Sequence, residues 1–101
     1  MTDAAVWFEG LYVRLGDGSM LFDPVSWETH LLNPSATTLA EAIFERFSET
    51  RPSVEIVEEM VRDEFNWDAA SPSFVQTMHV LCNAQLVAAD SSRFRAKYVD
   101  R

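Results

Sequence analysis

Apolar and polar residues alternate in the first third of the chain, and this pattern predicts three short strands. Trp7 to Leu15 is rich in aromatic and β-branched residues and runs into the turn-forming stretch Gly16 to Ser19. Because Gly and Asp tolerate the positive φ of tight turns, this stretch predicts a hairpin with Met20 to Phe22 as its returning strand. Pro24 marks an edge or a bend. Trp27 to Leu32, closed by an Asn-Pro pair, predicts the third strand.

Helical spacing follows and predicts three helices. Ser35, Ser53 and Ser71 are each suited to cap a helix N-terminus, and Pro72 strengthens the third start. We expect the third helix to fray near Ala88–Asp90. Three strands followed by three helices predict an α+β domain with a helix-turn-helix-like second half. The apolar positions that define the three helical faces are Leu39, Ile43, Phe44 and Phe47; Val54, Val57, Met60, Val61 and Phe65; and Phe74, Val75, Met78, Leu81, Cys82 and Leu86.

The composition fits one globular domain. The 101 residues are 48% apolar and 12% aromatic, which supplies enough material for one core. No apolar run approaches the ~20 residues that a membrane span needs. The N-terminus lacks the basic and apolar regions of a secretory signal. Cys82 is the only cysteine, so we expect a cytoplasmic protein without an internal disulfide.

The charge is strongly acidic and unevenly distributed. Sixteen acidic residues stand against eight basic ones, for a net charge of -8, and half of the bases lie near the C-terminus at Arg93, Arg95, Lys97 and Arg101. Such a surface either confers solubility or attracts a basic peptide, and both interpretations stay open. It repels nucleic-acid phosphates. The predicted third helix offers Gln76, Asn83 and Gln85 but has no Lys or Arg, so binding of nucleic acid is the weaker hypothesis.

Motifs that indicate catalysis are not found. His30 and His79 lack the spacing of a zinc site, and no serine lies in a Gly-x-Ser-x-Gly elbow. The three glycines form neither a P-loop nor a dinucleotide fingerprint. Paired carboxylates such as Glu58-Glu59 fall on a solvated helical face. We therefore predict that the chain is not an enzyme and that it needs no cofactor and no metal.

A binding surface is the remaining interpretation. An open strand edge can accept another strand, and side-chain pockets then give selectivity. Alternation along the predicted third strand puts Glu28, His30 and Leu32 on one face, which we expect to face the helices, and leaves Trp27 and Leu31 on the other. The third helix carries more apolar residues than one stripe requires, from Phe74 to Val87. A groove between this strand and this helix would explain the surplus, with Met78 as an adaptable wall.

Four stretches of the chain carry a family resemblance. They are Val25-Ser26-Trp27-Glu28-Thr29-His30-Leu31-Leu32-Asn33-Pro34, the helix start at Ser35-Ala36, the segment Val54-Glu55-Ile56-Val57 and the ending Leu81-x4-Leu86-Val87. Together they resemble the PqqD family of peptide-binding domains. The match is closest to the PqqD-like proteins found beside HPr-kinase-related proteins, and it covers roughly residues 7–90. Relatives show a glycine where this chain has Trp27, which alters the bend before the strand.

The resemblance implies a winged-helix peptide chaperone in residues 1–90, with a basic tail in residues 91–101. In that family a leader peptide adds to the third strand, lies against the third helix and is presented to a modifying enzyme. The expected partners are therefore a precursor peptide and a modifying enzyme or HPr-kinase-related protein. A winged-helix transcription regulator, a structural subunit that dimerises through its sheet edge, and a homodimer are the open alternatives. Carried over by position, the peptide-binding residues are Glu28, Thr29, His30, Leu31, Leu32, Val75, Met78, His79 and Cys82.

Overall fold

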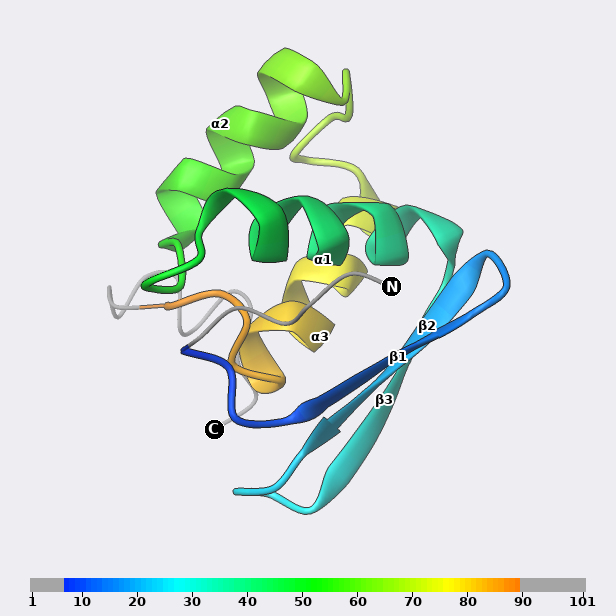
Figure 1. The fold of residues 1–101 in the computed structure, drawn as a ribbon. Helices are drawn as coiled ribbons and strands as arrows, with labels where there is room; N and C mark the ends of the chain where they lie inside the picture. Colours follow the sequence, from blue (N-terminus) through cyan, green and yellow to red (C-terminus); the bar gives the residue numbers. More distant parts are fainter. Residues whose placement is uncertain (1–6, 90–101) are drawn as a thin grey trace.

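The computed structural model describes residues 7–89 and shows three antiparallel strands followed by three helices (Figure 1). This confirms the predicted α+β class, and the order of elements is compatible with a winged helix. The predicted tail, residues 91–101, lies outside the described residues. The described helices include none that is long and apolar enough to cross a membrane. The elements are β1 (Leu11–Leu15), β2 (Gly18–Asp23), β3 (Glu28–Leu32), α1 (Pro34–Arg46), α2 (Val54–Glu64) and α3 (Pro72–Asn83).

The sheet is a three-stranded meander in the order β1-β2-β3, so β3 is an edge strand. The β1–β2 turn consists of Gly16 and Asp17, and Gly16 has a φ of 63°. Gly18, also predicted for the turn, is the first residue of β2. The β2–β3 loop runs from Pro24 to Trp27 and is held by Asp23, whose carboxylate accepts bonds from the Val25 amide and the Ser26 hydroxyl. Trp27 is not part of β3, contrary to prediction, because its φ of 60° lies outside the extended region.

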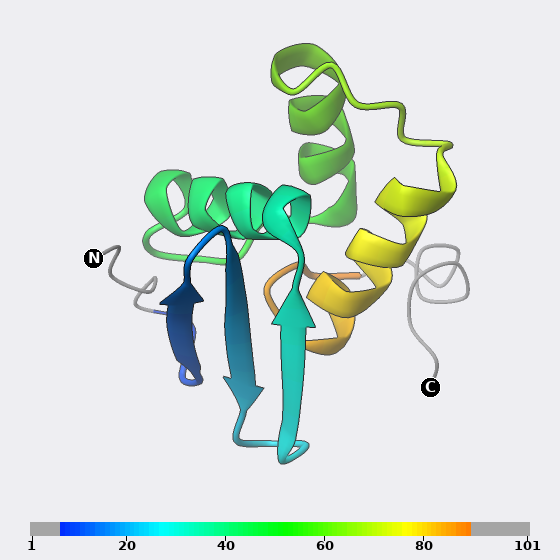
Figure 2. The same cartoon turned by 90° about the vertical axis from the view of Figure 1, so that its right-hand side faces the viewer.

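One face of the sheet packs against the helices. Ser19 and Leu21 of β2 and Leu32 of β3 point inward and are buried. In Figure 2, which looks onto the opposite face of the sheet, none of the helices in residues 7–89 lies in front of the strands. We call this side of the sheet the outer face. The largest fully buried side chains, which form the core, are Leu21, Leu39, Ile43, Val54, Val57, Val61, Phe74, Met78, Leu81, Leu86 and Val87.

Two predicted N-caps are confirmed and one is wrong. Ser53 and Ser71 accept hydrogen bonds from the amides of Ile56 and Phe74. The first helix is capped by Asn33, not Ser35, because the Asn33 side chain accepts from the Ala36 amide and Pro34 takes the first helical position. Proline fits there because its missing N–H would have no partner inside the helix.

The predicted fraying of the third helix near Ala88–Asp90 is also wrong. The helix ends at Asn83, and Gln85 turns the chain with a φ of 66°. Leu86 and Val87 are buried but not helical. Ala88 then pairs with the segment before α2: its amide donates to the Pro52 carbonyl at 2.8 Å, and its carbonyl accepts from Val54 at 3.2 Å. This bridge joins the end of α3 to the start of α2.

Candidate functional site: the open edge of β3 and its groove

The edge of β3 presents backbone groups that β2 does not use. A Cβ atom placed on Gly18 would lie 2.8 Å from the carbonyl oxygen of Leu32, so this oxygen points toward β2. In an antiparallel pair, successive residues of a strand direct their N–H and C=O groups alternately toward the partner and away from it. It follows that the backbone groups of Thr29 and Leu31 face the open edge, because Leu32 and His30 face β2.

A groove of about 210 Å³ lies beside this edge, between the end of β3 and α3. Its lining combines apolar side chains with hydroxyl and amide groups. It contains no charged side chain. The groove is lined by Leu31, Leu32, Asn33, Ala36, Ser73, Gln76, Thr77 and Val80.

The strand half of the predicted site is located at this edge. Glu28, Thr29 and Leu31 are exposed, His30 is partly buried, and Leu32 is buried and belongs to the core. The expectation that Leu32 points toward the helices is confirmed. Leu31 contributes to the groove lining and is also exposed on the outer face, so β3 separates two surfaces.

The predicted peptide-binding residues on α3 are placed differently from the prediction. Met78 is fully buried and Cys82 nearly so, which means that they support α3 from within and do not form an adaptable wall. Val75 packs partly against the core, and His79 is partly buried. The groove is instead lined by Ser73, Gln76, Thr77 and Val80. These positions lie beside the apolar stripe of α3, and spacing around that stripe was the only signal that could have found them.

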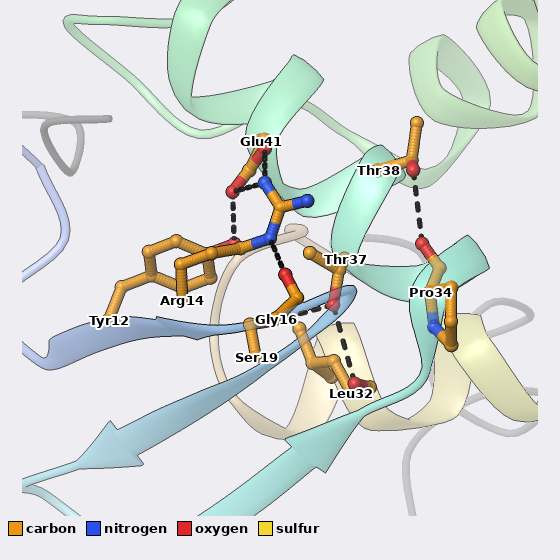
Figure 3. A network of polar contacts seen from close by, with 9 residues as sticks. All are labelled: Tyr12, Arg14, Gly16, Ser19, Leu32, Pro34, Thr37, Thr38 and Glu41. Carbon is orange, nitrogen blue, oxygen red and sulfur yellow. Dashed lines mark hydrogen bonds and ion pairs between the residues drawn. The ribbon is translucent and has the colours of Figure 1, made fainter. Parts of the chain in front are cut away.

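A buried polar contact fixes the end of β3 against α1 (Figure 3). The hydroxyl oxygens of Ser19 and Thr37 are 2.8 Å apart, and Thr37 donates to the Leu32 carbonyl at 3.3 Å. Ser19 and Thr37 are both buried. A hydrogen bond in such surroundings has no competing water, so it holds one relative position of strand and helix. We call Ser19, Thr37 and the Leu32 carbonyl the β3–α1 clasp.

The opposite edge of the sheet is tied to the same helix (Figure 3). Arg14 donates to both carboxylate oxygens of Glu41 at 2.9 Å, and Tyr12 donates to Glu41 at 2.7 Å. Burial, together with the Glu41 carboxylate, raises the pKa of Tyr12 to about 12. Since β1 and β3 are both attached to α1, the helix sets the position of the open edge.

His30 carries an unsatisfied polar atom on the inner side of β3. Its Nε2 is buried and lacks a hydrogen-bond partner within the described part of the chain. The carboxylate oxygen Glu28 Oε2 is 3.9 Å away, which is too far for a hydrogen bond. Buried polar atoms are usually bonded, so this nitrogen is an exception among the buried side-chain atoms of residues 7–89.

Another concave region borders no strand. Its volume is about 380 Å³, and it lies among loops that include Trp7, Pro24, Glu49, Arg51 and Gln85. Within residues 7–89, no group of three or more His, Cys, Asp or Glu side chains is arranged to hold a metal ion. The open edge with its groove is therefore the best-defined candidate site.

Comparison with family models, with curated proteins and with solved structures finds no match for this chain.

Proposed function

We propose that this chain is a non-catalytic peptide-binding domain. It receives an extended segment of a precursor peptide as a fourth strand along β3, against α3, and presents that peptide to a modifying enzyme. One observation carries the proposal: the outward-facing backbone groups of Thr29 and Leu31 form an open edge, and at Leu31 this edge reaches a groove that can take side chains. Strand addition needs this combination, because main-chain hydrogen bonds supply affinity and pockets for alternate side chains supply selectivity.

The clasp supports the same function. A peptide strand binds best to an edge that is already in its bound geometry, because less ordering entropy is lost on binding. The Leu32 carbonyl is held by Thr37 and directed toward β2. Leu31, the preceding residue, is thereby fixed with its N–H and C=O outward.

The chemistry of the site favours an uncharged or basic peptide. The residues that line the groove carry no charge, and Glu28 is exposed at the start of β3. The net charge of the whole chain is -8, which disfavours an acidic ligand. A winged-helix regulator of transcription is less well supported, because α3 contains neither Lys nor Arg to contact phosphates.

The proposal predicts that a proline at the open edge weakens peptide binding without unfolding the domain. The Thr29 N–H does not face β2, so Thr29→Pro removes an edge donor and leaves the β2–β3 pairing intact. Thr29→Ala is the matched control, because it removes the same side chain and keeps the N–H. Peptides are first selected from a displayed library of random linear peptides on the immobilised wild-type chain.

We expect Thr29→Pro to raise the dissociation constant of a selected peptide about tenfold or more, equivalent to about 1.4 kcal/mol. Thr29→Ala should stay within about twofold, since no main-chain bond is lost. Isothermal titration calorimetry measures both, with far-UV circular dichroism to confirm the fold. Equal affinities of the two variants would remove the edge of β3 from the binding mode. A shift of random duplex DNA at low salt would favour the regulator instead.

A further inference from the structure

The outer face of the sheet is an apolar surface without charge. On a sheet with one face exposed to solvent, the outward-facing residues are normally polar, but here the outward positions are almost all hydrophobic. The register places Leu11, Val13 and Leu15 of β1 on the same face as Met20 and Phe22 of β2 and Leu31 of β3. Gly18 and Thr29 are the other two outward strand positions. No charged residue occurs among these eight.

Large side chains on this face are well exposed. Leu11, Leu15 and Leu31 are each more than half exposed, from 53% for Leu15 to 74% for Leu31. Trp27 is 81% exposed and lies on this side because its ring contacts outward-facing Phe22, with ring centroids 6.0 Å apart. By contrast, Ile56 of α2 is exposed elsewhere on the molecule.

Trp27 also has an unfavourable backbone. Its φ of 60° lies in the left-handed region, where the Cβ atom crowds the following carbonyl oxygen, so a bulky residue such as tryptophan rarely adopts it. A glycine would take this conformation without strain. The chain therefore accepts backbone strain to place an exposed indole on an apolar face, and such outliers concentrate at functional sites.

We propose that the outer face binds a second copy of this chain, sheet against sheet, with Trp27 as its anchor. The net charge of the chain favours a second copy as the partner of this face. Each copy carries a net charge of -8, so two copies repel wherever their charged surfaces meet. The outer face lets two copies meet without placing like charges in contact. A different protein partner would be free to use charge complementarity for recognition, and this face offers none.

The exposed apolar area of the outer face also fits a second copy. With up to about 250 Å² for a large aromatic side chain, the four exposed side chains present on the order of 500 Å² of apolar surface. The partly buried Val13, Met20 and Phe22 lie between them. A stable interface buries about 800 Å² on each partner, and the four exposed side chains alone would supply more than half of that area. Two sheets packed face to face with twofold symmetry would each offer the same patch.

Sedimentation equilibrium of the full chain over a range of concentrations tests the proposal. We expect the wild type to form a dimer that tightens as salt is raised, because salt screens the repulsion between two acidic copies. Leu15→Thr replaces an apolar side chain with a β-branched residue that favours strands, and Trp27→Gly removes the anchor while relieving the φ strain. Each should raise the dimer dissociation constant about tenfold or more. Ile56→Gln, which removes an exposed apolar side chain outside this face, should leave it unchanged.

Three results would overturn the proposal. The first is a wild-type chain that stays monomeric at its highest soluble concentration. The second is a dimer that neither Leu15→Thr nor Trp27→Gly weakens. The third is a dimer lost in Thr29→Pro but kept in both outer-face variants, which would place the contact at the β3 edge. Circular dichroism of each variant confirms that a lost dimer does not reflect unfolding.

Discussion

The β3–α1 clasp makes a quantitative prediction about stability. Thr37→Val keeps the shape of the side chain but deletes the hydroxyl that bonds both Ser19 and the Leu32 carbonyl. Ser19 is buried, so its hydroxyl loses this partner in a place that water does not reach. Ser19→Ala is the reciprocal change, and there Thr37 keeps its bond to Leu32.

The expected costs follow from this difference. A net hydrogen bond contributes about 1 kcal/mol, and a buried polar group left without a partner costs roughly 1–3 kcal/mol. Thr37→Val should therefore lower the free energy of unfolding by about 2 kcal/mol, and Ser19→Ala by about 1 kcal/mol. The double variant leaves no orphaned hydroxyl, so its cost should be about 2 kcal/mol, which is about 1 kcal/mol below the sum of the single costs.

Urea unfolding followed by circular dichroism measures these values, with the slope m expected to stay constant across the set. The matched control is Thr38→Val on the next residue of α1. The Thr38 hydroxyl donates to the Pro34 carbonyl but is exposed to solvent, so its loss should change stability by less than about 0.5 kcal/mol. If Thr37→Val cost no more than Thr38→Val, or if the single costs simply added, the clasp would not hold β3 to α1.

Two further predictions concern protons. Burial raises the pKa of the Cys82 thiol to about 12. At mildly alkaline pH this thiol should therefore react with Ellman's reagent far more slowly in the native chain than in urea. Equal reaction rates would contradict the burial of Cys82. The pKa values of Tyr12 and Cys82 are raised from 10.0 and 9.0 to about 12, so at alkaline pH the folded chain keeps protons that the unfolded chain has released. The free energy of unfolding should therefore fall from about pH 9 toward pH 12. Urea midpoints that do not change over this range would refute the assignment.

Local sequence chemistry predicted the order and type of all six elements, because each left a short-range signal. Alternation marked the strands, the Gly-Asp-Gly turn marked the first hairpin, and Ser53 and Ser71 marked two helix starts. The error at the first helix came from assigning Asn33-Pro34 only to the end of the strand. Asn33-Pro34 ends the strand and also starts the helix, since asparagine caps and proline fits the first turn.

Tertiary structure decided the remaining features. The apolar period of α3 continues through Leu86, but the chain leaves the helix at Ala84 so that Ala88 can pair with Pro52. Gln85 takes the positive φ of this turn without the glycine that would mark it in the sequence. The apolar positions of α3 were assigned to the groove, yet Met78 is required by the core. Which flank of a helix lines a groove depends on its rotation against the sheet, and periodicity alone does not fix that rotation.

The two proposed surfaces use different parts of β3, and this allows both to operate at once. Strand addition uses the backbone groups of Thr29 and Leu31, which lie in the plane of the sheet. Dimerisation uses the Leu31 side chain, which stands roughly perpendicular to that plane because side chains project from the pleat. A peptide at the edge and a second copy on the outer face therefore approach from directions about 90° apart. Leu31→Ala should consequently weaken the dimer more than it weakens peptide binding, whereas Thr29→Pro should do the opposite, because only the proline removes a main-chain donor.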